Sequence, residues 1–358
     1  MSLVQTQSIA LSNSQLGTKV EGRVFTGSGT DVLRAVAQHA GVDSLQILSN
    51  IIHQLLVPKG TDWTSVIQGE YLQVYPDSFG TFSLVWDDLT HQLVAHGSTF
   101  QSTRYPWVAL LAHIRTIESH RGLGLGSLVT EQVTERALQQ GAGVVVLATD
   151  DKLHRLNQGE RAAHSMYSRL GYAVLGEKRL ADTVDWLMAI NEPLRQLSCT
   201  QANDSATQLA TAQHQCVADI QHAYLAKGAK LTISPVNAGD LPALFLLCNL
   251  CPEDDYQLKL ASWDVHLGPE LERTFITVIR QAIVDQDRLH DASQVIRDEC
   301  GRIVGVCAMR QLSPFTRQTF AIDCYAMPEF VQHHPALMKE LVESAIQRVR
   351  EGNDSIHT

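Results

Sequence analysis

Long hydrophobic runs, positive charge and aromatic residues are all scarce in this sequence. No stretch of its 358 residues approaches the ~18 consecutive apolar residues needed to cross a bilayer. Residues 1–22 are polar and lack the basic start and apolar core of a secretory signal. Lys and Arg total 28 against 38 Asp and Glu, and the net charge of −10 argues against a broad nucleic-acid-binding surface. We therefore expect a cytoplasmic protein with no membrane or nucleic-acid partner.

Cysteine is also sparse, and its distribution argues against a disulfide framework. The seven cysteines are scattered and odd in number, as expected of free thiols in a reducing compartment. Cys248 and Cys251 form a C-x-x-C pair, which in other settings supports redox or zinc chemistry. Here the pair lies in an apolar helical run, with no second pair at zinc-like spacing. We expect buried structural cysteines and no bound metal.

The length predicts two domains, because 358 residues exceed one ordinary α/β core. Residues 1–22 are interpreted as a flexible tail or a loosely attached edge segment. A first domain is expected over 23–192, a helical linker over 193–230 and a second domain over 231–358. The linker is rich in Ala, Gln and Thr, and a strand–helix pattern restarts after it.

Two helices are expected before the strands of the first domain. Thr30 is a candidate N-cap for a helix over 31–40. A second helix is expected over 44–56, and its inner face is predicted to carry Leu45, Leu48, Ile52 and Leu55. A hairpin follows, and His96 in its return strand, 92–101, is interpreted as structural or solvated.

The centre of the first domain is a strand, a glycine-rich turn and a helix. An apolar run over 107–112 predicts a buried strand, and apolar residues at helical spacing from Leu125 onward predict a helix. The turn, residues 114–126, has the sequence IRTIESHRGLGLG. Backbone N–H groups at a helix start lack intrahelical partners, and glycines lack the Cβ atoms that would block access to them. With Arg121 beside it, this turn predicts a site for an anion such as phosphate.

Three glycine motifs compete for this turn. A dinucleotide site needs G-x-G-x-x-G after the first strand, whereas here the spacing is G-x-G-x-G deep inside the chain. A Walker loop needs a Lys after its last glycine, and none follows Gly126. The pattern R-x-x-G-x-G fits Arg121, Gly124 and Gly126. A turn that only connects a strand to a helix is the alternative without a ligand.

A second motif lies downstream of the glycine turn. Residues 162–172 have the sequence AAHSMYSRLGY, close to the pattern A-A-x-x-x-Y-x-x-L-G-F. Between the motifs, the apolar run 144–148 predicts a buried parallel strand. In this order and separation the motifs resemble those of the GNAT N-acetyltransferase superfamily, over about residues 29–190. The resemblance implies an α/β (α+β mixed sheet) GNAT fold followed by a second, truncated GNAT-like domain. It also implies acetyl-CoA as the cosubstrate.

The resemblance implies roles for residues of both motifs. The CoA pyrophosphate would be bound by Arg121, Gly122, Leu123, Gly124, Leu125, Gly126 and Ser127. The pantetheine arm would pair with the strand end at Ile114, Arg115 and Thr116. Tyr167 matches the family's tyrosine that contacts the cofactor and protonates the leaving thiolate. Glu160 stands where the family often has an Asn that contacts pantetheine, which is a departure from the pattern.

The sequence leaves the general base open. Many relatives carry a carboxylate on the strand before the turn, but here that face carries Leu110, Ala112 and Ile114. The candidates are Glu118, Asp150 and His113, and a bound water is an alternative proton relay.

The C-terminal half is expected to be a degenerate copy of the first fold. Its counterpart of the glycine turn is 328–335, where Val331 replaces the arginine and Gln332 and His334 replace glycines. We expect this half not to bind CoA, and to complete the acceptor cleft or to stabilise the fold. His333 and His334 have no third ligand nearby, so no metal site is expected there.

Together these patterns predict an acetyl-CoA-dependent N-acetyltransferase that acts on a primary amine by direct attack in a ternary complex. A small-molecule amine is the first expectation, and the acidic balance suits a cationic acceptor. A protein or peptide amine is one alternative, and an acyl-CoA-binding sensor without turnover is another. A monomer or a homodimer is expected.

Overall fold

The structure, a computed structural model, divides into two compact units, Met1–Leu147 and Ala148–Thr358. It describes residues 4–13, 17–56, 78–152, 163–179, 183–199, 205–226, 228–251, 293–311 and 320–354.

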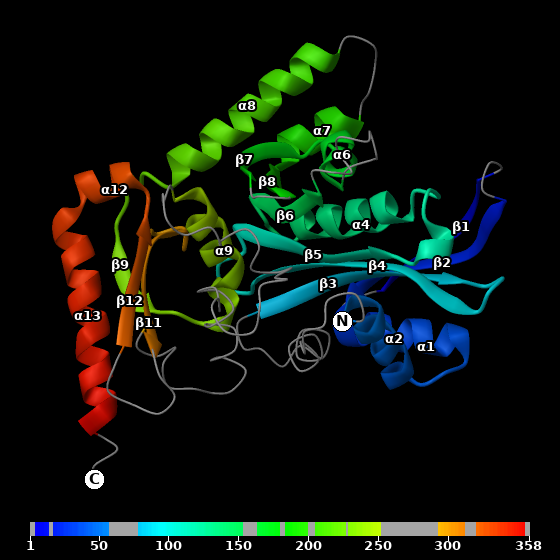
Figure 1. The fold of residues 1–358 in the computed structure, drawn as a ribbon, viewed down its shortest axis with the longest axis horizontal. Helices are drawn as coiled ribbons and strands as arrows, with labels where there is room; N and C mark the ends of the chain where they lie inside the picture. Colours follow the sequence, from blue (N-terminus) through cyan, green and yellow to red (C-terminus); the bar gives the residue numbers. More distant parts are fainter. Residues whose placement is uncertain are drawn as a thin grey trace. The chain divides into compact units, whose positions relative to one another are not determined.

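A mixed sheet forms the centre of the first unit (Figure 1), with neighbouring strands in the order β1, β2, β3, β4, β5 and β6. Their bounds are β1 (Gln5–Asn13), β2 (Thr18–Ser28), β3 (Ser78–Asp87), β4 (Gln92–Ser102), β5 (Val108–Thr116) and β6 (Val144–Lys152). The pairs from β1 to β5 are antiparallel, whereas β5 and β6 are parallel. A parallel pair needs a crossover connection, and α4 (Leu125–Gln139) supplies it.

Helices cover both faces of this sheet (Figure 1). On one face, α1 (Gly29–Ala40) and α2 (Ser44–Leu56) share a buried cluster with Phe82 and Leu84 of β3. On the other face, α4 shares a cluster with Val85 of β3 and Val94 of β4. Successive strand residues point to opposite faces, so β3 contributes to both clusters.

A β-bulge interrupts the pairing of β4 with β5. The register shifts between His96 and Ser98, and the extra residue lies in β5. His113 adopts a φ of 58°, a left-handed conformation that residues other than glycine rarely take. Bulges bend a strand and redirect its side chains. This one lies directly before the part of β5 that leads into the glycine turn.

The second unit begins within β6 and continues with the segment that carries the second motif. That segment contains α6 (Ala163–Arg169), β7 (Ala173–Arg179) and β8 (Thr183–Ile190), and β7 pairs antiparallel with β8. Two further helices follow, α7 (Glu192–Cys199) and α8 (Ser205–Ala223). They occupy the part of the chain that was predicted to be a helical linker.

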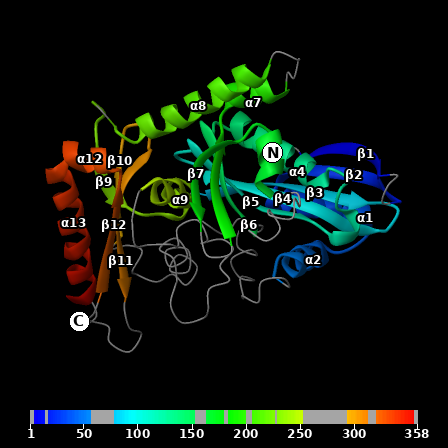
Figure 2. The same cartoon turned by 45° about the horizontal axis from the view of Figure 1, so that its top comes forward.

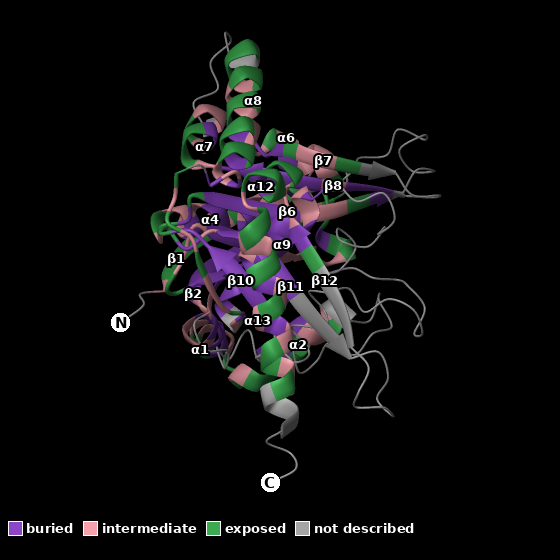
Figure 3. Cartoon of the chain, turned by 90° about the vertical axis from the view of Figure 1, so that its left-hand side faces the viewer, coloured by how far each residue is buried: buried purple, intermediate pink, exposed green. Residues whose placement is uncertain are grey.

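A four-stranded antiparallel sheet forms the C-terminal part of the second unit (Figure 2), in the order β12, β11, β10, β9. Its elements are β9 (Thr232–Pro235), η2 (Ala238–Asp240), α9 (Leu241–Leu250), β10 (Gln294–Arg297), β11 (Ile303–Gln311), β12 (Phe320–Ala326), α12 (Pro328–His333) and α13 (Pro335–Asp354). Figure 3 shows buried residues along β10 and along the described part of β11, 303–307, while α13 exposes one side. A buried ion pair joins Arg297 to Asp240.

The mixed α/β class expected from the sequence is confirmed, including the parallel strand that follows the glycine-turn helix. The separate four-stranded sheet is consistent with a second domain. The domain bounds and the tandem interpretation of residues 231–358 stay predictions. Over 328–335 the chain is α12 and the start of α13. Among the described residues, no helix is both long and apolar enough to cross a membrane.

Three local expectations differ from the structure. Residues 5–13 were expected within a flexible tail or a loosely attached edge segment. They form β1, an edge strand that pairs with β2 along its whole length, so the edge position agrees and the flexible tail does not. Helix α1 begins at Gly29 with Ser28 as its N-cap, so Thr30 does not cap it. In α2 the expected Leu48 is buried and Ile52 packs against the core, but Leu45 is 67% exposed, and Ile47 and Ile51 are buried as well. The side chain of Leu55 lies outside the described residues. Neighbouring faces of α2 are both apolar, so periodicity alone did not select the one that meets the sheet.

Replacing Ile51 by Ala should destabilise the first unit, because its side chain is fully buried between α2 and the sheet. We expect the free energy of unfolding to fall by about 2–4 kcal/mol in chemical denaturation. The matched control is Leu45→Ala on the same helix, which should change it by less than about 0.5 kcal/mol. Equal losses for both variants would contradict this orientation of α2.

Candidate acyl-CoA site

The short segment that leads from β5 into the glycine turn is held against the sheet of the first unit. After β5, the Ile117 N–H donates a hydrogen bond to the Val94 carbonyl over 3.0 Å. A 3-10 helix, η1 (Glu118–His120), follows. The His120 ring is 4% exposed, and its Nε2 lies 3.6 Å from Oδ2 of the fully buried Asp87 at the end of β3. The turn therefore starts from a fixed point on the sheet.

Asp87 is itself held by several donors. Its carboxylate accepts hydrogen bonds from the Glu21 N–H (3.2 Å), the Leu89 N–H (3.4 Å) and the N–H and hydroxyl of Thr90 (3.1 and 2.5 Å). Burial works against the charged carboxylate, but these hydrogen bonds outweigh it and lower the pKa of Asp87. Asp87 thus remains ionised beside His120 at neutral pH.

The turn itself ends in a helix start with open backbone amides. Gly122 and Gly124 have φ values of 81° and 80°, and Gly124 is the N-cap of α4. The helical ladder begins with the Leu128 N–H donating to the Gly124 carbonyl over 3.0 Å. The N–H groups of residues 125–127 precede that ladder, and the helix dipole places partial positive charge there. A Cβ added at Gly124 would meet no atom within 4 Å, so the space in front of the turn is open.

Two leucines anchor this turn from below. Leu123 and Leu125 are 7% and 1% exposed, and both belong to the cluster that contains Val129 of α4 and Val94 of β4. The intervening Gly124 is exposed. Alternation of leucine and glycine therefore fixes the turn on its inner side and leaves bare backbone on its outer side. From the N-terminal hairpin, Asn13 Nδ2 also donates to the Gly122 carbonyl over 3.4 Å.

Positive side chains lie beside the open amides. Arg121 is exposed, and Arg115 at the end of β5 is half-buried. Desolvation lowers the pKa of Arg115, the charge of Arg121 lowers it further, and Glu118 partly offsets both effects. The two guanidinium groups therefore repel each other electrostatically. The region around the turn carries a positive potential that a bound anion would neutralise.

The strand before the turn keeps a backbone edge that another strand could use. Parallel pairing of β5 with β6 runs from Val108↔Val144 to Leu110↔Val146. Within the described residues, no further pair of this ladder follows, although β5 continues to Thr116. The end of β5, where Ile114, Arg115 and Thr116 lie, can therefore hydrogen-bond an extended ligand by strand addition.

His96 lies near the bulge but is a poor candidate for proton transfer. Its side chain is fully buried, and within the described residues neither ring nitrogen has a hydrogen bond of good geometry, although the His113 backbone lies close enough to affect the His96 pKa. Desolvation lowers its pKa to about 3, with a smaller contribution from His113. A neutral, sequestered imidazole with so low a pKa cannot hold a proton at neutral pH. This agrees with the structural interpretation of His96.

In the second unit, α6 presents Tyr167 beside a buried carboxylate. The Tyr167 side chain is buried, and its ring makes an edge-on contact with Tyr172 at 5.8 Å between centroids. Burial raises the pKa of Tyr167, and the charge of Asp151 raises it further. The phenol therefore keeps its proton across the physiological pH range.

Asp151, at the end of β6, organises this part of the unit. One carboxylate oxygen accepts a hydrogen bond from the Ala163 N–H over 2.6 Å, and the other lies 2.6 Å from His164 Nδ1. The His164 ring stacks on Trp186 of β8, with centroids 4.5 Å apart and planes 28° apart. Asp151 is 7% exposed, so this cluster is tied to a buried charge.

The structure brings together the predicted residues of the first unit but not all of the catalytic candidates. Residues 114–116 and 121–127 form one continuous strand end, turn and helix start. Glu118 is exposed on η1, and Asp150 is exposed on β6 in the second unit. Glu160 lies outside the described residues.

Sequence reasoning missed Asp151, His164 and Trp186. Asp150 was singled out, yet strand alternation turns Asp150 outward and Asp151 inward. The spacing of His164 and Tyr167 was a usable signal, because residues three apart share one face of a helix. Trp186 carried no local signal, since only the fold brings β8 against α6.

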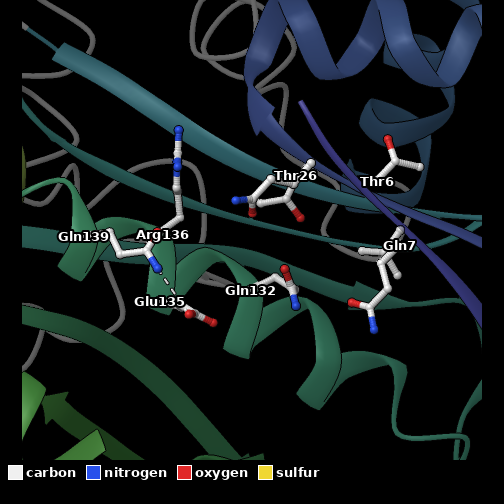
Figure 4. Close-up of a pocket in the computed structure, with 9 residues that line it drawn as sticks. Thr6, Gln7, Thr26, Gln132, Glu135, Arg136 and Gln139 are labelled. Atoms are coloured by element: carbon white, nitrogen blue, oxygen red, sulfur yellow. Dashed lines mark hydrogen bonds between the residues drawn. The ribbon is translucent and has the colours of Figure 1, made fainter. Parts of the chain in front are cut away.

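A polar pocket elsewhere in the first unit does not overlap these residues. It lies between the N-terminal hairpin and α4 and is lined by Gln5, Thr6, Gln7, Val24, Thr26, Gln132, Glu135, Arg136 and Gln139 (Figure 4). Within the described residues, no group of three or more His, Cys, Asp or Glu side chains is placed to hold a metal ion. Cys248 and Cys251 are buried at the C-terminal end of α9, as expected.

Comparison with known families supports the resemblance derived from the motifs. Residues 103–181 match the family model described as FR47-like protein, which is GNAT-like. This range contains both the glycine turn and the tyrosine motif. The GNAT resemblance is therefore confirmed for this part of the chain, and its tandem extension stays a prediction. No curated protein sequence matches the chain.

Several solved structures share limited similarity with the chain. An aminoglycoside 6'-N-acetyltransferase complexed with coenzyme A is 16% identical, over 40% of this chain and 89% of that one, with a TM-score of 0.32. An acyl-CoA N-acyltransferase from Pseudomonas aeruginosa is 16% identical, over 46% and 97%, with a TM-score of 0.31. Escherichia coli ElaA is 16% identical, over 52% and 99%, with a TM-score of 0.30. The fold is defined by the chain's own strand order.

Replacing Asp87 by Asn should destabilise the first unit, because an amide nitrogen would face donors that now bind a carboxylate. We expect the free energy of unfolding at pH 7 to fall by about 1–3 kcal/mol. The pKa of Asp87 is lowered in the folded state, so the stabilisation is complete above the unfolded pKa near ~4 and is lost as the pH falls through the folded value. Urea titrations of both proteins should therefore differ at pH 7 and converge at acid pH. A difference independent of pH would contradict the charged role of Asp87.

Proposed function

We propose that the protein is an acetyl-CoA-dependent N-acetyltransferase that acts on a primary amine, first of all a small-molecule amine. The observation that carries this proposal is the glycine turn at the start of α4, where open amides and two arginines meet. The family match over 103–181, which includes the turn, supports this proposal. The reaction proposed is direct attack of the amine on the thioester in a ternary complex.

The open backbone amides of the glycine turn suit a pyrophosphate. Arg121, Gly122, Leu123, Gly124, Leu125, Gly126 and Ser127 are proposed to bind it, mainly through backbone N–H groups. Anions at a helix start gain from both the unpaired amides and the helix dipole. Gly124 is open in front, and a side chain there would fill the space that a phosphate needs. Arg121 adds a planar fork of donors that matches phosphate oxygens.

The strand end is proposed to hold the extended arm of the cosubstrate. Ile114, Arg115 and Thr116 would offer backbone groups in the manner of an added strand. The bulge at His113 redirects the chain just before them. Such pairing fixes the direction of the arm without relying on side-chain chemistry, so it tolerates the apolar residues on this strand.

Tyr167 is proposed as the general acid that protonates the departing thiolate. The phenol is protonated in the resting state, because burial and the charge of Asp151 raise its pKa. A raised pKa also makes the phenol a weaker acid, so this assignment rests on the match of Tyr167 to the family's tyrosine and not on its pKa. Glu118 and Asp150 are candidates for the base that accepts the amine proton, and both are exposed. Glu160 is carried over only as the residue at the position of the family's Asn.

The C-terminal sheet is proposed to complete the acceptor cleft or to stabilise the fold. It is not proposed to bind CoA. The chain at 328–335 is helical, and the Val331 N–H already donates to the Met327 carbonyl over 3.1 Å. An amide engaged in a helix is not available to a phosphate. Peptide or protein amines remain the closest alternative acceptors, and a monomer or homodimer is the expected state.

A thiol-release assay with acetyl-CoA and a panel of amines tests the proposal. Release that depends on an added amine supports an acetyltransferase, and the best acceptor identifies the substrate class. Saturable binding of acetyl-CoA without release for any small-molecule or peptide amine would support a sensor instead. Absence of both binding and release would contradict the proposal.

Replacing Arg121 by Ala should weaken CoA binding by about 10-fold to 100-fold, because a charge-assisted hydrogen bond contributes about 1.5–3 kcal/mol. Isothermal titration calorimetry measures this change. Arg34→Ala, which removes another exposed arginine of the first unit, is the control and should leave the affinity unchanged. Equal affinities for the Arg121 variant and the parent would overturn the assignment.

Replacing Tyr167 by Phe should slow turnover by about 10²-fold to 10⁴-fold, because it removes the proton donor while keeping the ring. The affinity for CoA and the melting temperature should change little, since the phenol is the only group removed. Steady-state kinetics and calorimetry on the same preparation separate the two effects. An unchanged kcat would show that another group, or water, protonates the thiolate.

A further inference from the structure

His164 is held by two contacts that together fix its ring and its tautomer. Asp151 Oδ2 lies 2.6 Å from His164 Nδ1. The N–H groups of Ala163 and His164 donate to the same carboxylate, so Asp151 acts here as an acceptor and Nδ1 is the donor of this bond. The lone pair of the neutral imidazole is then on Nε2, the nitrogen that can accept a proton.

Trp186 fixes the plane of the ring. The two rings are stacked at 4.5 Å with an interplanar angle of 28°. A flat aromatic surface at this distance also stabilises the ring when it becomes cationic. The His164 side chain remains 25% exposed while Asp151 is 6% exposed, so the histidine alone of this pair is open to a ligand.

The same carboxylate also acts on Tyr167. His164 and Tyr167 are three residues apart on α6 and share a face of that helix. The charge of Asp151 contributes to the raised pKa of Tyr167, which places all three groups in one electrostatic environment. His164, a possible proton acceptor, and Tyr167, a proton donor, thus lie about one helical turn apart. Asp151 contacts the first and acts electrostatically on the second.

We propose that His164 is the general base of the acyl transfer, with Asp151 and Trp186 as its positioning residues. This inference rests on the proposed function. As the proposed general base, His164 replaces the earlier candidates Glu118 and Asp150, which are exposed and are not part of the cluster around Asp151.

The proton balance follows from these positions. The amine nitrogen bonds to the thioester carbonyl carbon and gives one proton to His164 Nε2. The C–S bond breaks with its electron pair on sulfur, and the thiolate takes the proton of the Tyr167 hydroxyl. The imidazolium then returns its proton to the phenolate before the next turnover, which restores both groups. Asp151 accepts the Nδ1–H bond throughout and stabilises the imidazolium.

Two histidines of the first unit, His96 on β4 and His113 on β5, do not meet these requirements. His96 is fully buried, and its pKa of about 3 leaves it without a proton at neutral pH. His113 is held in a left-handed conformation in the bulge, with its ring edge-on to Phe100 at 5.8 Å. Of these histidines, only His164 combines partial exposure with a bound carboxylate on one ring nitrogen.

A structural role is the competing explanation, because Asp151 also accepts hydrogen bonds from the N–H groups of Ala163 and His164 at the start of α6. Asp151 variants would therefore mix helix capping with catalysis. The informative change is His164→Ala, which leaves the capping oxygens of Asp151 and the backbone N–H groups in place. His164→Gln adds a variant that can still donate to Asp151 but cannot accept a proton.

The experiment measures amine-dependent thiol release for the parent and both variants, with and without added imidazole. We expect kcat to fall by about 10²-fold to 10⁴-fold in both variants, with the KM for acetyl-CoA changed by less than about threefold. Imidazole should restore part of the rate to His164→Ala, whose deletion leaves room for it, and not to His164→Gln. His214→Ala, an exposed histidine on α8, is the control and should match the parent with or without imidazole.

The outcomes separate the two claims. Retained kcat in His164→Ala and His164→Gln would overturn the role of His164 while leaving the acetyltransferase proposal intact. A lower kcat in His164→Ala that imidazole does not restore, together with a lower melting temperature, would assign His164 to structure and also overturn it. An inactive parent that fails with every amine would overturn the proposed function and this inference together.

Discussion

The constraint on which the rest depends is the alternation of buried leucine and bare glycine at the start of α4. Leu123 and Leu125 are fixed in the core beside the sheet, and Gly124 between them has nothing in front of it. Side chains on the inner side prevent the turn from collapsing, while the missing Cβ on the outer side leaves the first helical amides accessible. Every statement about cosubstrate binding depends on that asymmetry.

The surrounding sheet keeps this turn in place and supplies its charge. Asp87 at the end of β3 holds His120, and the end of β5 carries Arg115 next to Arg121. The bulge in β5 changes the course of the strand immediately before these residues. Binding and chemistry are thus proposed for different elements, with backbone amides and arginines in the first unit and proton transfer on α6 in the second.

The sequence predicted those features that are defined by residues close together in the chain. The glycine turn, the helix after it and the parallel strand β6 follow from spacing and periodicity, and the structure has all three. The bulge at His113 was not predictable, because it is defined by the register of β5 against β4. The pair of Asp151 and His164 was missed for the same reason, since β6 and α6 meet only in the folded chain. Leu45 shows the limit of periodicity, because two faces of α2 are apolar and only packing selects one.

Calorimetric titration of the protein with coenzyme A, compared with pantetheine, tests the central claim most directly. Pantetheine keeps the extended arm and the thiol but lacks the pyrophosphate. The account predicts saturable heat with coenzyme A at micromolar to low millimolar concentrations, much weaker binding of pantetheine, and loss of the difference in a Gly124→Val variant. No heat with coenzyme A at millimolar concentration, or equal affinities for the two ligands, would contradict it.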